Sequence, residues 1–185
     1  MRAMPIRLSA VVFLVLAVVG GSALAAMPNA ATVKWQHLVV TGTGLAVDMP
    51  GTPVKGDDLT IGSLRSVAYR LESGETRAYG VRAEQIPADE LTLEGADGLF
   101  DDIRDGMLAD GTLRAEWSLR PQGGAVGRGL IIDSAVKSGP DSYTTIAHIY
   151  VHGDWIYELV ATVPRGGDHD PVALRFLDSA RFAGK

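Results

Sequence analysis

Asp168-His169-Asp170, directly after Gly166-Gly167, is the densest group of side chains that could bind a metal or transfer a proton. One histidine and two carboxylates on a flexible loop are donors that suit Zn²⁺ or Mn²⁺. A hydrolase would need the same three residues to converge with another acid or histidine. However, Asp170 precedes Pro171, and this pair is typical of a helix start, with aspartate as N-cap and proline in the first turn. The sequence therefore favours a structural use of Asp170 and leaves the loop as a weak candidate site.

A second group of acids, Asp97, Asp101 and Asp105, recurs every four residues, which places the three carboxylates on one stripe of a helix. Such a stripe could gather a hard cation such as Ca²⁺. The sequence has no Asp-x-Asp-x-Asp-Gly loop, and like charges four residues apart repel each other. Acids are also favourable near the positive end of a helix. We therefore expect a solvated helix face here.

The remaining motifs also favour structural roles. His148 and His152 share one face of a predicted strand but lie about 13 Å apart, too far to bind one ion; we expect His148 on a wetter face or against a helix. The glycine-rich residues 123–129 open a strand and no lysine follows, which predicts a hairpin turn rather than a phosphate loop. No Gly-x-Ser-x-Gly elbow occurs. We expect no catalytic residue, no metal and no cofactor.

Aromatic residues could line a ligand groove. The chain has three tryptophans and five tyrosines, and most of them fall on alternating positions of predicted strands. That alternation favours packing in the core.

The first 25 residues have the pattern of an export signal. Arg2 and Arg7 give a basic start, residues 8–19 are apolar, and Ala23-Leu24-Ala25 is a cleavage signal. The apolar part, about 12 residues, is shorter than the ~20 needed to span a bilayer. We expect cleavage, export to the periplasm or the outside of the cell, and no stable membrane insertion of the mature chain. Residues 26–32 are expected to be a flexible start, and residues 33–185 a single domain.

Composition narrows the function classes further. The sequence has no cysteine, which excludes disulfides, thiol nucleophiles and thiolate metal sites. The formal net charge is −5, and cleavage would remove two arginines and no acid. An acidic chain lacks the basic surface that nucleic acid requires, so we expect no nucleic-acid partner.

Eight segments have the period-two alternation of strands, and two have a helical period. The strands are expected over residues 33–41, 45–49, 64–71, 77–86, 113–119, 126–136, 143–152 and 154–163. The alternation places Leu113, Trp117 and Leu119 on one face and Glu158 on a wetter face. The helices are expected over residues 96–109, ended by Gly111, and 171–179.

Strands in series with two separate helices predict an α+β fold, in which helices flank an antiparallel sheet. An eight-stranded β-barrel is the alternative, although the mid-chain helix argues against it.

Two segments carry longer motifs. Residues 45–53 read Leu-Ala-Val-Asp-Met-Pro-Gly-Thr-Pro, and residues 149–164 lead into a C-terminal Arg-Phe-Leu-Asp-Ser-Ala-Arg-Phe at 175–182. The C-terminal part resembles the ending of PsbP-like domains, although Ala180 stands where that pattern usually has Phe. Residues 45–53 resemble their first strand, with Leu45 in place of a frequent Phe, and also the start of small exported bacterial proteins of unknown function. The resemblance implies an α/β/α sandwich without catalytic residues, in a group of assembly and binding proteins.

The expected function is therefore that of an exported, non-catalytic binding or assembly-accessory protein with a partner in the envelope or outside the cell. A small-molecule or lipid carrier is one alternative, and an exported hydrolase that uses Asp168, His169 and Asp170 is another. A deep apolar pocket would favour the carrier, whereas an exposed apolar patch would favour the protein binder.

Overall fold

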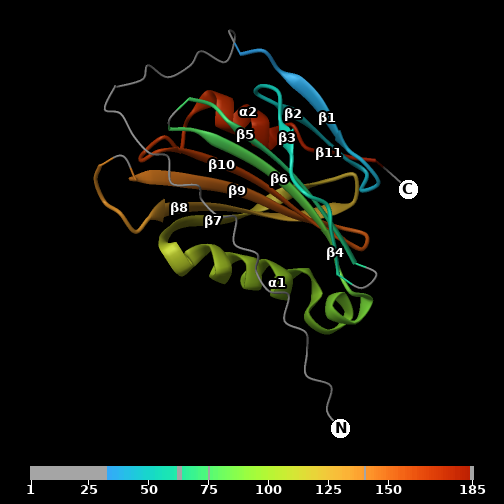
Figure 1. Cartoon of the computed structure of the whole chain (residues 1–185). Helices are drawn as coiled ribbons and strands as arrows, with labels where there is room; N and C mark the ends of the chain where they lie inside the picture. Colours follow the sequence, from blue (N-terminus) through green and yellow to red (C-terminus); the bar gives the residue numbers. More distant parts are fainter. Residues whose placement is uncertain (1–32, 62–63, 75, 140, 184–185) are drawn as a thin grey trace.

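The structure is a computed structural model that describes residues 33–61, 64–74, 76–139 and 141–183 (Figure 1). The predicted signal peptide (1–25) and flexible start (26–32) lie outside the described residues.

Most described strands form one large antiparallel sheet. Its hydrogen-bonded order is β3 (Val54–Lys55), β5 (Leu64–Glu72), β6 (Ala78–Gln85), β10 (Trp155–Pro164), β9 (Tyr143–His152), β8 (Ala125–Ser134) and β7 (Gly111–Gln122), and β4 (Leu59–Ile61) pairs beside β3 on β5. The described path is open and ends at β3 and β7, so the eight-stranded barrel alternative is wrong. The predicted α+β fold with an antiparallel sheet flanked by helices is confirmed.

A second, smaller sheet joins the two segments that resemble PsbP-like domains. Its order is β1 (Gln36–Val40), β2 (Leu45–Met49) and β11 (Arg181–Phe182). The predicted pairing of the first two strands is confirmed, with Leu38 opposite Val47. The backbone N–H of Asp48 also donates to the Ser179 hydroxyl at 2.8 Å. The two ends of the described chain are thus joined by backbone and side-chain hydrogen bonds.

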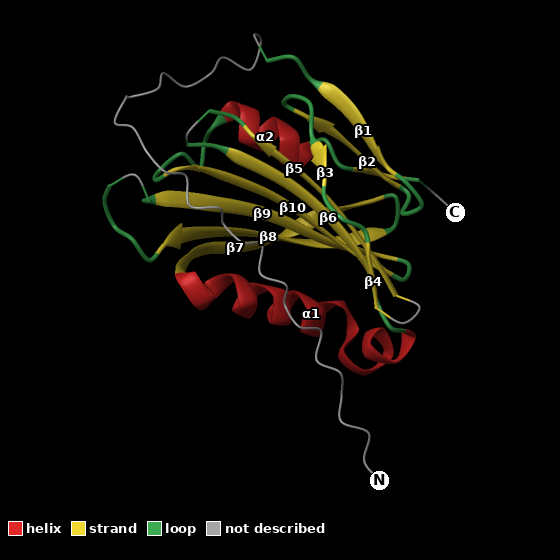
Figure 2. Ribbon diagram, viewed as in Figure 1, coloured by secondary structure: helices red, strands yellow, loops and turns green. Residues whose placement is uncertain are grey.

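Both faces of the large sheet are covered, one by a helix and the other by a helix together with the small sheet (Figure 2). Helix α1 (Ala88–Met107), followed by a 3₁₀ turn (Leu108–Asp110), packs on one face; α2 (Pro171–Asp178) and the small sheet pack on the other. Alternate residues of β10 define the two sides. Ile156 and Val160 belong to the hydrophobic core between the sheet and α1, and Tyr157 and Leu159 belong to the hydrophobic core between the sheet and α2. We call these sides the α1 face and the α2 face.

The first helix differs from its prediction. It begins at Ala88 rather than at residue 96, because Asp89 and Glu90 suit its positive N-terminal turn. Gly95 interrupts it with φ of 66°, a conformation that glycine adopts at little cost. The helical spacing of apolar residues in the sequence belongs only to the second half of α1, after this kink. The other helix agrees with its prediction to within one residue.

The alternation along β7 also differs from its prediction. An irregularity between Leu113 and Ala115 adds one residue to the strand. Leu113 consequently packs with the core on the α1 face, whereas Leu119 packs with the core on the α2 face. The sequence pattern placed both on one face, because a bulge reverses the alternation without changing composition.

Both faces of β10 are covered, so Glu158 is buried rather than on a wetter face.

The short strands β3, β4 and β11 were not predicted, since two or three residues are too few to show a period.

Candidate functional site

The three residues of the predicted loop site do not form one site: His169 Nε2 lies 3.7 Å from the Asp168 carboxylate, but Asp170 has other partners. The Asp168 carboxylate pairs with Arg114 at 3.0 Å, and the His169 ring is 92% exposed. Asp170 is fully buried at the start of α2. These three side chains do not converge on a common cavity.

Asp170 is the predicted N-cap of α2. Its carboxylate accepts from the backbone N–H groups of Val172 (2.9 Å) and Ala173 (3.1 Å). Its second oxygen accepts from Arg77 Nε at 3.0 Å, and both side chains of this ion pair are buried. Both carboxylate oxygens of Asp170 therefore accept hydrogen bonds from structural donors.

Asp168 belongs to a charged network at the end of the sheet. Burial raises the pKa of Asp168, but hydrogen bonds from its own backbone and from Arg114 outweigh burial and lower that pKa below its ordinary value. Arg114 also reaches Asp133 at 3.3 Å, and Asp133 accepts from the Thr144 hydroxyl at 2.7 Å. The network ties β7, β8 and β9 to the loop before α2.

The acidic stripe of α1 is neutralised by two arginines. Arg128 of β8 contacts Asp97 at 3.0 Å and Asp101 at 2.6 Å, and Arg104 contacts Asp101 at 2.8 Å and Asp105 at 2.9 Å. The hydrogen bond from Arg128 is the largest cause of a lowered pKa at Asp101. The carboxylates bind α1 to the sheet. Among the described residues, no group of three histidine or acidic side chains could hold a metal ion.

A groove lies on the α2 face, beyond the part of the sheet that α2 covers. Its volume is about 320 Å³, and its lining comes from β7, β9 and the end of α2: Trp117, Ser118, Leu119, Arg120, His148, Tyr150 and Asp178. A second hollow, about 200 Å³, lies at the hairpin turns that contain Gly44 and Gly153.

Two glycines shape the floor of the larger groove. A Cβ on Gly129 would lie 2.2 Å from Cε2 of Trp117, and one on Gly127 would lie 2.6 Å from Cδ1 of Tyr150. The aromatic rings therefore lie directly on the backbone of β8. Trp117 remains 36% exposed, because α2 packs over β10 and β9 and does not extend over β7.

His148 lies at the centre of this floor. Its ring meets the edge of Trp117 at 6.0 Å between centroids, and its Nδ1 lies 3.5 Å from the Tyr150 hydroxyl. Burial lowers the pKa of His148 from its ordinary value of 6.5, against the attraction of Asp178 and a hydrogen bond with the backbone of Leu177. Burial is also the main cause that raises the pKa of Tyr150 to about 12. The floor is therefore uncharged at neutral pH.

The rim of the groove carries opposite charges. Arg120 and Asp178 both line it and both side chains are exposed. Neither forms an ion pair with another described side chain, in contrast to the acids of the α1 stripe and to Arg104 and Arg128. The groove thus combines an aromatic floor with a free cation and a free anion.

Sequence reasoning found part of this site. Trp117 was among the aromatic residues that could line a groove, and the placement of His148 against a helix is confirmed. Arg120 and Asp178 were missed, since nothing in their spacing connects them. Glycines two residues apart on β8, at 127 and 129, were the available signal, because strand glycines mark a close approach by neighbouring side chains.

Ser118, His148 and Asp178 are the residue types of a hydrolase triad, but they are not arranged as one. Ser118 lies opposite Arg128, whose side chain pairs with acids on the α1 face. Trp117, the next residue, lies opposite Gly129 and His148 on the α2 face. Because neighbouring strand residues point to opposite faces, the Ser118 hydroxyl points away from His148.

Comparisons with known proteins were made for sequence and for structure. No family model and no curated protein matches the sequence. The solution structure of cyanobacterial PsbP (CyanoP) from Synechocystis sp. PCC 6803 matches with a TM-score of 0.56 and 15% identity, over 89% of this chain and 98% of that one. PA94 from Pseudomonas aeruginosa, a protein of unknown function, matches with a TM-score of 0.43 and 10% identity, over 76% and 90% of the two chains.

No helix among the described residues is long and apolar enough to cross a membrane. The match to cyanobacterial PsbP covers nearly the full length of both chains and supports the predicted PsbP-like domain. This chain has the PsbP-like fold.

Proposed function

We propose that the mature chain is an exported, non-catalytic protein that binds a partner in the cell envelope or outside the cell, through the groove on the α2 face. The observation that carries this proposal is the half-exposed Trp117 beside two unpaired charges, Arg120 and Asp178. Tryptophan and arginine are enriched where proteins bind each other, and they supply much of the binding energy there.

The charges of the groove differ from those of the two acidic groups that the sequence offered as sites. Asp170, Asp168 and the three acids of the α1 stripe, Asp97, Asp101 and Asp105, have close cationic partners, which explains them as parts of the fold. Arg120 and Asp178 have no such partners among the described side chains. A bound partner could supply them, so these two charges support a role in recognition.

The same geometry gives less support to the alternative functions. A volume of about 320 Å³ is at the lower end of the range for small-molecule sites, and the charged rim suits a lipid chain poorly. The hydrolase alternative needs Asp168, His169 and Asp170 to converge, but only Asp168 and His169 are in contact, and Asp170 is buried against Arg77 and the start of α2.

Capture from an envelope fraction tests the proposal. Residues 26–185 are used as bait, together with Trp117→Ala and a matched control, Val54→Ala, which removes an exposed apolar side chain from the opposite edge of the sheet. We expect one protein that the wild type and the control both capture and that Trp117→Ala loses. Equal capture by all three baits would contradict the proposal. Circular dichroism of each bait verifies that it is folded.

A further inference from the structure

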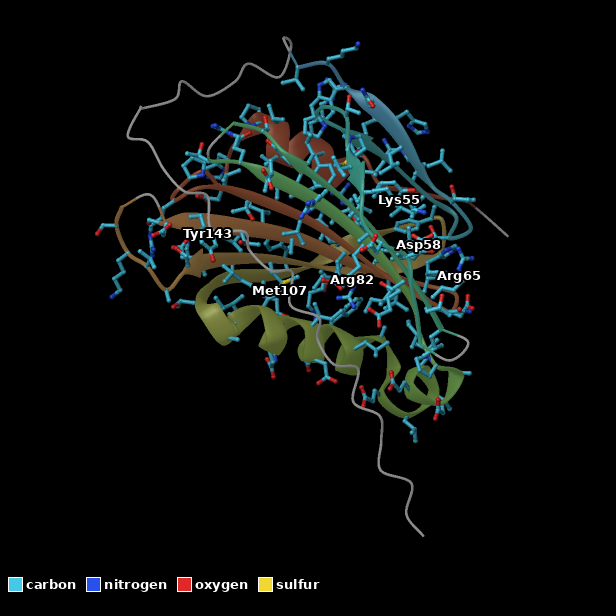
Figure 3. All side chains as sticks on the ribbon, in the orientation of Figure 1. Lys55, Asp58, Arg65, Arg82, Met107 and Tyr143 are labelled. Atoms are coloured by element: carbon cyan, nitrogen blue, oxygen red, sulfur yellow. The ribbon has the colours of Figure 1, made fainter. Side chains whose placement is uncertain are left out.

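Strand β7 is an edge of the large sheet. It has twelve residues, and among the described strands it pairs only with β8. The other edge of the described sheet is formed by β3 and β4, which have two and three residues. Lys55 and Asp58, which pair at 2.8 Å, lie at that edge (Figure 3). Short strands and charges discourage pairing with another chain, so of these two edges of the described large sheet β7 is the one that offers a long strand.

Two irregularities in its register with β8 divide β7 into a regular middle segment and two ends that pair less regularly. The register shifts between Leu113 and Ala115 and again between Leu119 and Gln122. Bulges of this kind interrupt the row of backbone donors and acceptors at an edge. Between them, Ala115–Leu119 keeps a regular register with β8. These five residues are the part of the edge that can accept another strand.

The side chains of this window differ between the two faces. On the α1 face, Glu116 contacts Arg128 at 2.9 Å and Arg104 at 3.6 Å, so its charge is already paired. On the α2 face, Trp117 is exposed at the groove. An added strand would lie beside β7, so one of its side chains on this face would contact Trp117.

We propose that the window Ala115–Leu119 binds an extended segment of the partner, which adds a strand to the large sheet and packs an apolar side chain against Trp117 at the edge of the groove. An acidic side chain of that segment pairs with Arg120, which directly follows the window and has no ion pair among the described side chains. This proposal rests on the proposed function and names the chemistry of its partner. Edge N–H and C=O groups are best satisfied by another strand, which is why we infer an extended segment rather than a helix.

A phage-displayed library of random twelve-residue peptides, selected on residues 26–185, provides a probe. Selected peptides are expected to contain a β-prone segment with an aromatic or branched apolar residue and a nearby acid. Their affinity should fall at least tenfold with Trp117→Ala and severalfold with Arg120→Gln, while the control Val54→Ala leaves it unchanged.

N-methylation of one selected peptide, one position at a time, is the decisive step. Every second amide of an added strand bonds to the edge, so N-methylation should abolish binding at alternate positions and be tolerated between them. This readout does not depend on any variant of the protein folding correctly. Sensitivity without a period of two would overturn strand addition, and so would peptides that bind Trp117→Ala as well as wild type.

Two further outcomes separate this inference from the proposed function. Envelope capture could depend on Trp117 while N-methylation has the same effect at every position of the peptide. That result would reject strand addition and leave the groove as the binding site. If light scattering shows a dimer that Trp117→Ala dissociates, a second copy of the chain occupies the edge, and the proposal of a partner segment is wrong.

Discussion

The α1 face and the groove on the α2 face use charge in opposite ways. On the α1 face, Arg104 and Arg128 pair with the acids of the helix, and Arg82 contacts Glu84 and Glu158 close to the sheet (Figure 3). On the α2 face, the groove has a neutral floor and an unpaired Arg120 and Asp178 at its rim.

This difference shows that the density of charged residues is a poor guide to function in this chain. The acidic stripe of α1 is a prominent chemical pattern in the sequence, yet its arginine partners make it part of the fold. The groove has a less prominent pattern, and its charges have no structural partner among the described residues. Unpaired charge beside an exposed aromatic ring is therefore the better indicator of a binding site here.

The largest expected effect is on the buried ion pair at the start of α2. Asp170→Ala removes a helix cap and leaves the buried Arg77 without its partner, so we expect a loss of about 3–5 kcal/mol in the free energy of unfolding. Denaturant unfolding measures it. Adding Arg77→Met to this variant should restore part of the loss. A cost near 1 kcal/mol, as for a cap alone, would show that the ion pair contributes little.

The core under α2 should be almost as sensitive. Phe176 is fully buried and meets the edge of Tyr79 at 5.5 Å between ring centroids, so Phe176→Ala should destabilise by about 3–5 kcal/mol. Leu174→Ala on the exposed side of the same helix is the control and should change stability far less. Similar urea midpoints for the two variants would mean that α2 is not packed as described.

Buried ionisable groups should give the two faces opposite pH dependences. Burial lowers the pKa of His148 on the α2 face, so its contribution to stability is complete above pH 6.5 and is lost as pH falls through the lowered pKa. Burial raises the pKa of Glu158 on the α1 face despite the attraction of Arg82. Its contribution is complete below pH 4.5 and is lost as pH rises through the raised pKa.

Unfolding free energies measured between pH 4 and 8 check these directions. Glu158→Gln should lose less stability than wild type as pH rises, and His148→Gln should lose less as pH falls towards the acid range. Parallel curves for wild type and both variants would contradict the assigned burial of the two groups.

The smallest effect is expected on the acidic stripe. The Asp97 side chain is 90% exposed and shares Arg128 with Asp101 and Glu116, so Asp97→Ala should not change stability measurably. Added Ca²⁺ should not raise the melting temperature of wild type or variant. A shift of several degrees that Asp97→Ala abolishes would mean that the stripe binds the ion after all.

Local patterns predicted much of the fold. The period of two in residues 143–152 and the Asp170-Pro171 pair gave correct elements, because these features act within a few residues. The bulge at Arg114 and the ion pair between Arg77 and Asp170 depend on distant partners. No local period reports them, so the sequence predicted the wrong face for Leu113 and only a cap for Asp170.

The groove was harder to predict for the same reason. Trp117, His148 and Asp178 come from three elements far apart in the chain, and only the strand order β9-β8-β7 brings them together. The glycines at 127 and 129 indicated a close approach, but not which rings would lie on them.

Site-specific photo-cross-linking in the envelope tests the groove as the binding site most directly. The photoreactive residue p-benzoylphenylalanine is placed at position 120, on the groove rim, or at position 105, on the exposed side of α1. We predict that irradiation joins the chain to one partner from position 120 and to none from position 105. Cross-linking from position 105 with none from position 120 would contradict the central claim that the α2 face is the binding face.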